Sequence, residues 1–277
     1  MPEVITLRTD DDYPLEATLY EGGEHAIVIA GAMGVPRRYY DAFARAAVEH
    51  GYRVLTFDYR GVGGSRPPSL RGFRGTLTEW GCLDLTAAIE RIRATNPKSI
   101  TLFGHSVGGQ IAGLASNADA VSRIVFVASQ SGYWRLWPHV RGIGLGLLWL
   151  LMPPITHAVG FFPSKLLGLG SENLPRFVAA QWAMWGKHPD YVFGYHDRAM
   201  AAALDVPLLA WSFADDHYAP KRAVEKLLTY YSSAKVEHRH VAARGIAHFG
   251  FFRRQLAGDL WEETFAWLTS HDRDRPL

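Results

Sequence analysis

Short strand-like segments alternate with helical stretches along most of the chain, and this alternation limits the fold more than any other feature. Most of the segments are rich in Val, Ile, Leu and Phe, as strands covered on both sides are. They lie at 25–30, 53–58, 99–104, 122–129, 206–213 and 234–241. Strands that alternate with helices form a mostly parallel sheet with helices on both faces, so we expect an α/β fold.

Local signals place several of the other elements. The segments 3–9 and 14–20 predict a hairpin, because Asp10-Asp11-Asp12 stands between them. Thr76 precedes Glu79 by three residues, the spacing of a capping box, which predicts a helix from about 77 to 95. Further helices are predicted at 37–51, which ends at Gly51, at 220–231, which starts at Pro220, and at 256–269.

The stretch 131–203 interrupts this rhythm. It holds five of the nine tryptophans and several prolines. A connection of this length rarely lacks secondary structure in a compact domain. We therefore predict a helical cap at 131–203, inserted into a core domain formed by 1–130 and 204–277.

One segment of the predicted cap looks like a membrane element. Residues 142–152 read GIGLGLLWLLM, Pro153 and Pro154 follow, and 158–162 are apolar again. A bilayer span takes about 20 apolar residues. Because the prolines are expected to end the helix, we predict a buried or lid helix and no stable membrane insertion. Contact of 142–162 with a membrane surface is the alternative.

Residues 104–108 read GHSVG and fit the pattern G-x-S-x-G. The pattern has chemical meaning only where a strand precedes it and a helix follows it. The strand-like segment 99–104 ends here, and 107–115 can form a helix. Small glycines give room for a sharp turn that holds the serine in an unfavourable backbone conformation. Ser106 is therefore a candidate nucleophile.

A serine nucleophile needs a histidine base, and the histidine needs an acid. His248 lies in a short loop between the last predicted strand and the last predicted helix. Asp215 and Asp216 both follow the strand-like segment 206–213. The chain order is serine, acid, histidine, which is the order that accompanies a G-x-S-x-G turn. Either aspartate fits this order.

Beyond the turn itself, several stretches carry a resemblance to one superfamily. They are FDYRGVGGSRP, SLRGF, GHSVGGQIAGLA, QSGYWRLWP, SFADDHYAP and AHFGFF. On these motifs the chain resembles the α/β-hydrolases over nearly its whole length, and more narrowly a group of bacterial predicted α/β-hydrolases. The resemblance implies an α/β-hydrolase fold and a catalytic triad.

The resemblance also implies roles for particular residues. The acid of this superfamily precedes a proline by four residues, which favours Asp216 with Pro220 and leaves Asp215 as the alternative. The oxyanion would be met by the backbone N–H of Val107 and by that of Ala32. Ala32 takes the last place of the His-Gly-x motif, in which Ala30 replaces the usual histidine. The loop 58–65 would have a structural role.

Side chains near these loops are candidates for the substrate pocket. Met33 follows Ala32 directly. Gln130, Tyr133, Trp134 and Trp137 follow a predicted strand whose end should face the site.

Composition and spacing argue against several other classes of function. The formal charge of +2 gives no reason to expect nucleic acid binding. The glycine spacing fits neither the dinucleotide motif nor the P-loop, so we expect no cofactor. His238 and His240 would share a strand face, but there is no cysteine partner and we expect no metal. With a single cysteine and no recognisable signal peptide, we expect a cytoplasmic protein.

These observations predict a carboxylesterase-like or lipase-like serine hydrolase. It would cleave an ester or related acyl bond of a small to medium apolar molecule through an acyl-enzyme, with Ser106, Asp216 and His248 as its triad. An acyltransferase or a peptidase with the same triad is one alternative. A ligand-binding or lipid-binding protein without turnover is the other. The sequence leaves the oligomeric state open.

Overall fold

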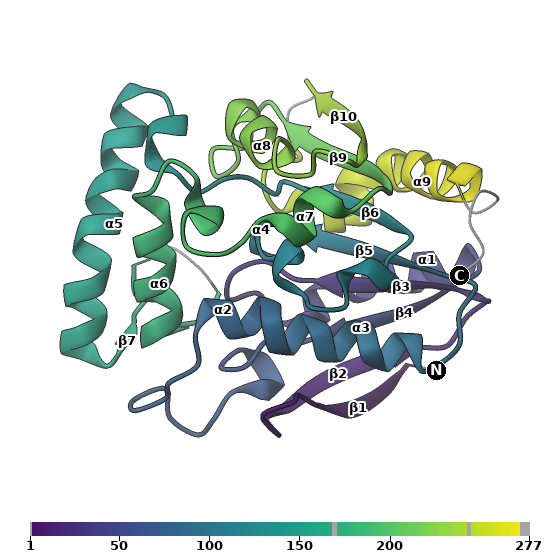
Figure 1. Cartoon of the computed structure of the whole chain (residues 1–277), viewed down its shortest axis with the longest axis horizontal. Coiled ribbons are helices and arrows are strands. Elements are labelled where there is room, and N and C mark those ends of the chain that lie inside the picture. Colours follow the sequence, from purple (N-terminus) through teal and green to yellow (C-terminus); the bar gives the residue numbers. More distant parts are fainter. Residues whose placement is uncertain (1, 168–170, 243–244, 272–277) are drawn as a thin grey trace.

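A computed structural model of the chain describes residues 2–167, 171–242 and 245–271. Its main sheet has eight strands in the order β1-β2-β4-β3-β5-β6-β9-β10 (Figure 1). The strands are β1 Glu3–Arg8, β2 Pro14–Tyr20, β3 His25–Ala30, β4 Tyr52–Phe57, β5 Ser99–His105, β6 Arg123–Val127, β9 Pro207–Phe213 and β10 Lys235–Val241. The β1–β2 and β2–β4 pairs are antiparallel and all other pairs are parallel. The predicted α/β class with a mostly parallel sheet is confirmed.

Helices cover both faces of this sheet. In Figure 1, α3 crosses in front of the strands and α1 lies behind them. The helices are α1 Asp41–Glu49, α2 Leu77–Glu79, α3 Thr86–Arg93, α4 Val107–Gln110, α5 His139–Val159, α6 Arg176–Gly186, α7 Ala199–Ala203, α8 Lys221–Leu228 and α9 Arg254–His271. A π-helical stretch, Trp80–Leu85, joins α2 to α3, and the predicted capping box of Thr76 and Glu79 is present.

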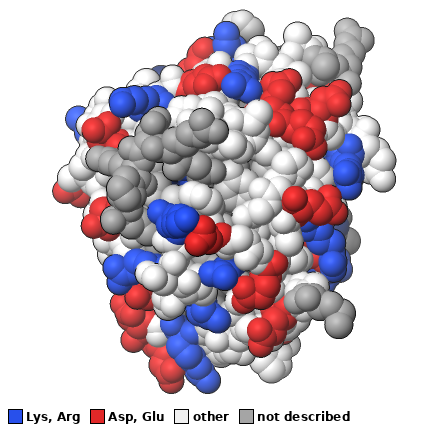
Figure 2. Space-filling model, turned by 90° about the vertical axis from the view of Figure 1, so that its right-hand side faces the viewer, with Lys and Arg blue, Asp and Glu red and all other residues white. Residues whose placement is uncertain are grey.

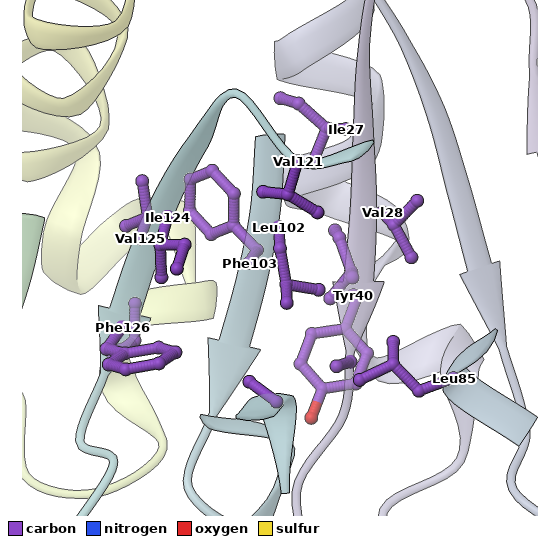
Figure 3. Close-up of a cluster of buried hydrophobic side chains, with 14 of the residues drawn as sticks. Ile27, Val28, Tyr40, Leu85, Leu102, Phe103, Val121, Ile124, Val125 and Phe126 are labelled. Atoms are coloured by element: carbon purple, nitrogen blue, oxygen red, sulfur yellow. The ribbon is translucent and has the colours of Figure 1, made fainter. Parts of the chain in front are cut away.

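The core lies where the central strands are covered on both sides. Every residue of β5 and β6 is buried, so these strands are apolar without the alternation of a half-exposed strand. Figure 3 shows Leu102, Phe103 and Ile124 among the side chains of this core. The register pairs Ala30 with Gly104 and His105 with Val127, which brings three strand ends to one place.

Helices α5 and α6 dominate the segment predicted as a cap. They pack against each other at one end of the molecule (Figure 1). A short two-stranded sheet, β7 Phe161–Phe162 with β8 Leu174–Pro175, lies in the same segment. A second apolar cluster, separate from the main core, includes Trp149, Met152 and Phe162. The division into a core domain and a cap stays a prediction.

Helix α5 corrects one expectation. Pro153 and Pro154 lie inside the helix and do not end it. The helix runs on to Val159 and stops at Gly160, which has the left-handed backbone conformation that favours glycine (φ 89°) and donates its N–H to the Thr156 carbonyl. Each proline removes a backbone N–H, but the apolar packing on α6 holds the helix together. At 21 residues, α5 is long and apolar enough to cross a membrane. The expectation that the prolines make this helix too short to span a bilayer is therefore wrong.

The loop 58–65 contains a buried ion-pair network. Arg60 is almost fully buried, and its Nε lies 2.7 Å from Asp84 Oδ1. The Arg60 backbone N–H donates to the other oxygen of Asp84 at 2.9 Å. Asp11 and Glu79 accept from the Arg60 guanidinium at 2.8 and 3.1 Å. The network ties the loop to the N-terminal hairpin and to α2.

We expect Asp84→Asn to lower the free energy of unfolding by about 3 kcal/mol, because the buried Arg60 guanidinium loses its buried carboxylate partner. Urea unfolding measures the free energy of unfolding. Glu90→Gln is the matched control, since Glu90 pairs with Arg93 at the surface and should change stability by less than about 1 kcal/mol. Equal effects of the two substitutions would contradict this view of the network.

Candidate active site

The turn that carries Ser106 is strained as the motif predicts. Ser106 joins β5 to α4 with φ 52° and ψ −113°, a combination that residues with a side chain rarely adopt. A Cβ atom at Gly108 would clash with the Ala30 carbonyl, and one at Gly104 would clash with the backbone of Gly109. The glycines are therefore needed because the backbones approach closely here.

The helix after Ser106 is shorter than predicted. Helix α4 begins at Val107 as expected, but it covers only Val107–Gln110, and a 3-10 turn at Ala112–Leu114 follows. Three glycines in these nine residues lower helix propensity. The turn still leaves the Val107 N–H without a hydrogen-bond acceptor among the described residues.

The structure separates the two adjacent aspartates. Asp216 Oδ2 lies 2.8 Å from His248 Nδ1, and both side chains are buried. The other oxygen, Asp216 Oδ1, accepts from the backbone N–H groups of Tyr218 and Ala219 at 2.8 and 3.0 Å. These two donors fix the carboxylate, which in turn orients the imidazole.

Asp215 points to different partners. Its oxygens accept the backbone N–H groups of Gly245 and Ala247 at 2.6 and 3.0 Å. Ala247 has a positive φ of 46° directly before His248. Asp215 therefore holds the loop that carries His248, whereas Asp216 contacts the imidazole itself.

Ser106 and His248 line the same cavity. Because His248 Nδ1 donates to Asp216, Nε2 is the nitrogen left to accept a proton. No hydrogen bond joins the Ser106 and His248 side chains in the described structure, which is common before substrate binds.

A second hydrogen-bonded chain runs beneath the site. The Ala32 N–H donates to the Tyr40 hydroxyl at 2.7 Å, and that oxygen lies 2.9 Å from His105 Nδ1. His105 Nε2 lies 2.9 Å from the His248 carbonyl. The Ala32 N–H can only donate and the His248 carbonyl can only accept, and burial holds the pKa of His105 well below its usual value, so the Tyr40 hydroxyl donates to Nδ1. His105 is therefore neutral, with its proton on Nε2.

This chain contradicts one predicted oxyanion donor. The Ala32 N–H is already bound to Tyr40, so Ala32 does not supply the second amide. The next amide along the loop, that of Met33, has no acceptor among the described residues. Met33 also lines the cavity with Ser106.

His105 should make stability depend on pH. Burial, helped by the charge of His248, holds the pKa of His105 well below its usual value. The unfolded chain then binds a proton that the folded chain does not, so stability is lost as pH falls below about 6.5. We expect the parent's stability advantage over His105→Gln to shrink by about 1.4 kcal/mol per pH unit in that range. Urea unfolding at a series of pH values measures it, and parallel curves for the two proteins would contradict it.

The cavity above Ser106 is mainly apolar. Its volume is about 130 Å³, close to the roughly 150 Å³ of an apolar cavity that takes up benzene. The wall carries one charged carboxyl side chain, that of Glu172, which accepts the Gly63 N–H at 3.1 Å. The other lining residues include Leu145, Leu148, Trp149, Met152, Phe162, Leu174, Trp182, Tyr218 and Phe249.

The predicted pocket residues divide into two groups. Met33, Gln130 and Trp137 line the cavity. Tyr133 and Trp134 do not, and expecting them there is wrong. Trp134 packs with the second apolar cluster instead, and the Arg135 guanidinium lies over its ring. The Tyr133 ring packs edge-on against Trp134, with the ring centres 6.4 Å apart.

Sequence reasoning missed the lining residues on α5. Leu145, Leu148, Trp149 and Met152 recur at helical spacing and share the inner face of the helix. The signal was present in GIGLGLLWLLM, but every residue of that segment is apolar or glycine. Apolar periodicity alone therefore did not separate an inner from an outer face.

The candidate metal histidines have another role. The side chains of His238 and His240 both lie within hydrogen-bond distance of Ser212 Oγ, at 2.7 and 2.8 Å. Among the described residues, no group of three or more His, Cys, Asp or Glu side chains could hold a metal ion.

The sheet order, with a strained serine after β5 and an acid–histidine pair in the loops after β9 and β10, defines the α/β-hydrolase fold. Residues 27–148 match the sequence model of the family described as alpha/beta hydrolase fold. The chain therefore has the α/β-hydrolase fold.

Individual relatives agree with this assignment. The quorum-quenching protein AidA of Acinetobacter baumannii is 24% identical over 242 residues, with 76% of this chain and 77% of that protein covered. An esterase of Exiguobacterium antarcticum superposes with a TM-score of 0.65 at 17% identity, covering 98% of this chain and 100% of that one. A soluble variant of the monoglyceride lipase of Saccharomyces cerevisiae gives 0.69 at 14% identity, covering 98% and 95%. These likenesses establish the fold.

Proposed function

We propose that the protein is a serine hydrolase that cleaves esters of small to medium apolar molecules. The observation that carries this proposal is the 2.8 Å hydrogen bond between Asp216 and His248, whose ring lines the same cavity as the strained Ser106. Esterase and lipase structures among the fold neighbours support a hydrolase as the class of enzyme.

In the proposed reaction, Ser106 Oγ attacks the acyl carbon while His248 Nε2 takes the hydroxyl proton. Asp216 stabilises the imidazolium that forms. The tetrahedral intermediate collapses, the bond to the alcohol breaks, and His248 returns the proton to the alcohol oxygen. Water then attacks the acyl-enzyme by the same route and releases the acid.

The backbone amides of Val107 and Met33 would bind the oxyanion. Replacing the Met33 amide by an ester, with the α-hydroxy analogue of methionine, removes this N–H and keeps the side chain. We expect kcat to fall by about 100-fold to 1,000-fold, the usual effect of losing one oxyanion donor. The same replacement at Ala32 is the control and should cost much less, because that N–H binds Tyr40. A larger loss of kcat at Ala32 than at Met33 would show that the Ala32 N–H is the second oxyanion donor.

The size of the cavity limits the substrate. An apolar cavity with about the volume that takes up benzene has room for a short acyl chain or a single ring. We expect kcat/KM on p-nitrophenyl esters to peak at short to medium acyl chains and to fall for long ones. Activity that rises steadily up to palmitate would contradict a cavity of this size.

The same triad also supports acyl transfer and peptide cleavage. Adding an alcohol or amine acceptor to the ester assay distinguishes transfer, because a transferase forms the acylated acceptor faster than the free acid. A peptide substrate panel addresses the peptidase. We place hydrolysis of esters first because the cavity wall is mainly apolar, with few polar groups to bind a peptide backbone.

A further inference from the structure

The outer face of α5 is an unusually exposed apolar surface. Five aliphatic side chains on this face have exposed fractions between 51% and 81%. They are Val140, Ile143, Leu147, Leu150 and Leu151. Their spacing places them on one face of the helix. Only 22% of the apolar 18-residue stretch of α5 is buried. A contiguous apolar surface of this kind on a soluble domain marks a site of interaction.

The opposite face of the same helix lines the cavity and packs on α6. Leu145, Leu148, Trp149 and Met152 face the cavity, and Trp149 packs on Trp182 of α6 with ring centres 4.7 Å apart. Trp149 Nε1 also donates to the Gly132 carbonyl at 3.2 Å. The helix is therefore held in place by its inner face and leaves the outer one without a protein partner among the described residues.

The charges on this part of the chain have one sign. No Lys, Arg, Asp or Glu occurs from 142 to 164, and no Asp or Glu occurs from 120 to 171. Arg135 lies four residues before α5 and Arg141 lies in its first turn, while Lys165 follows its end and Arg176 opens α6 beside it. In the described structure none of these four cations pairs with a carboxylate. Arg141 and Arg176 contact His217 and His157 instead.

We propose that the outer face of α5 binds the surface of a membrane that contains anionic lipid. The aliphatic side chains would enter the boundary between headgroups and acyl chains, and the cations at both ends would meet lipid phosphates. Figure 2 shows a different kind of surface at the other end of the molecule, where basic and acidic side chains are interspersed.

The charge pattern disfavours a second copy of the chain as the partner. Both ends of α5 are basic, so two α5 helices packed face to face would bring cations together in either direction. An anionic surface meets both ends favourably. The inner-face contacts favour a helix lying in the plane of the membrane surface, because spanning the bilayer would strip Trp149 and Met152 from the cavity wall.

Vesicle flotation tests this proposal with the full chain. The vesicles are phosphatidylcholine alone and an equal mixture of phosphatidylcholine and phosphatidylglycerol. We expect binding to the mixture and at least about tenfold weaker binding to phosphatidylcholine alone, since each cation near an anionic surface contributes several-fold. Leu147→Glu with Leu151→Glu should abolish binding. Arg135→Gln with Lys165→Gln should weaken binding to the mixture by about tenfold.

Val4→Glu is the matched control, because Val4 is equally exposed on β1, away from the helix. Hydrolysis of a short, soluble ester should be the same in all these variants, since none of the residues lines the cavity. Vesicle binding is measured separately from hydrolysis, so the test does not depend on the proposed function. Three results would overturn the proposal: equal binding of the Leu147/Leu151 variant, resistance of the bound protein to alkaline carbonate extraction, or a stable dimer in solution that the same variant dissociates.

Discussion

Ser106→Ala should lower kcat for ester hydrolysis by at least about 10⁴-fold, the scale on which serine hydrolases lose activity without their nucleophile. Alanine removes the only atom that forms the covalent bond and keeps the small side chain that the turn tolerates. The expected KM is nearly unchanged, because the apolar wall that binds the substrate is intact. Steady-state kinetics on a short p-nitrophenyl ester measures both values.

Ser164 offers a matched control for this substitution. It lines the same cavity, but its hydroxyl donates to the Glu172 backbone carbonyl and lies outside the Asp216–His248 pair. We expect Ser164→Ala to change kcat by less than about tenfold, since it removes one hydrogen bond of ordinary strength. Comparable losses in the two variants would show that Ser106 has no special role.

The two adjacent aspartates give the second large effect. Asp216→Asn should lower kcat by about 10⁴-fold, because an asparagine would stabilise the wrong tautomer of His248. Asp215→Asn should lower kcat by less than about tenfold and lower stability instead, since Asp215 binds the backbone of the loop before His248. Parallel kinetics and urea unfolding separate the two effects. A reversed order of kcat losses would assign the acid to Asp215.

Much of the fold and of the candidate site could be predicted from local patterns. The central strands are apolar throughout because helices cover both of their faces, and such runs are visible in the sequence. The strained turn at Ser106 follows from its glycines, and the serine, acid and histidine appear in the expected order. The strands and the turn depend on residues close to one another in the chain, and the three candidate catalytic residues can be recognised by their order alone.

The features that sequence reasoning missed depend on contacts between distant segments. The resemblance implies Ala32 as an oxyanion donor, but its N–H donates to Tyr40, which connects it through His105 to the His248 loop. Pro153 and Pro154 were expected to end a helix that packing on α6 maintains. The cavity wall could not be assigned because inner and outer residues of α5 are equally apolar.

Labelling with a fluorophosphonate probe tests the central claim most directly, because the probe reacts preferentially with a serine that a nearby base activates. The folded protein is treated with the probe, digested, and mapped by mass spectrometry. We predict one adduct, on Ser106, that disappears when the protein is denatured first and falls sharply in His248→Ala. A folded protein that takes up no probe, or that carries the adduct on another residue, would contradict the assignment of Ser106 as an activated nucleophile.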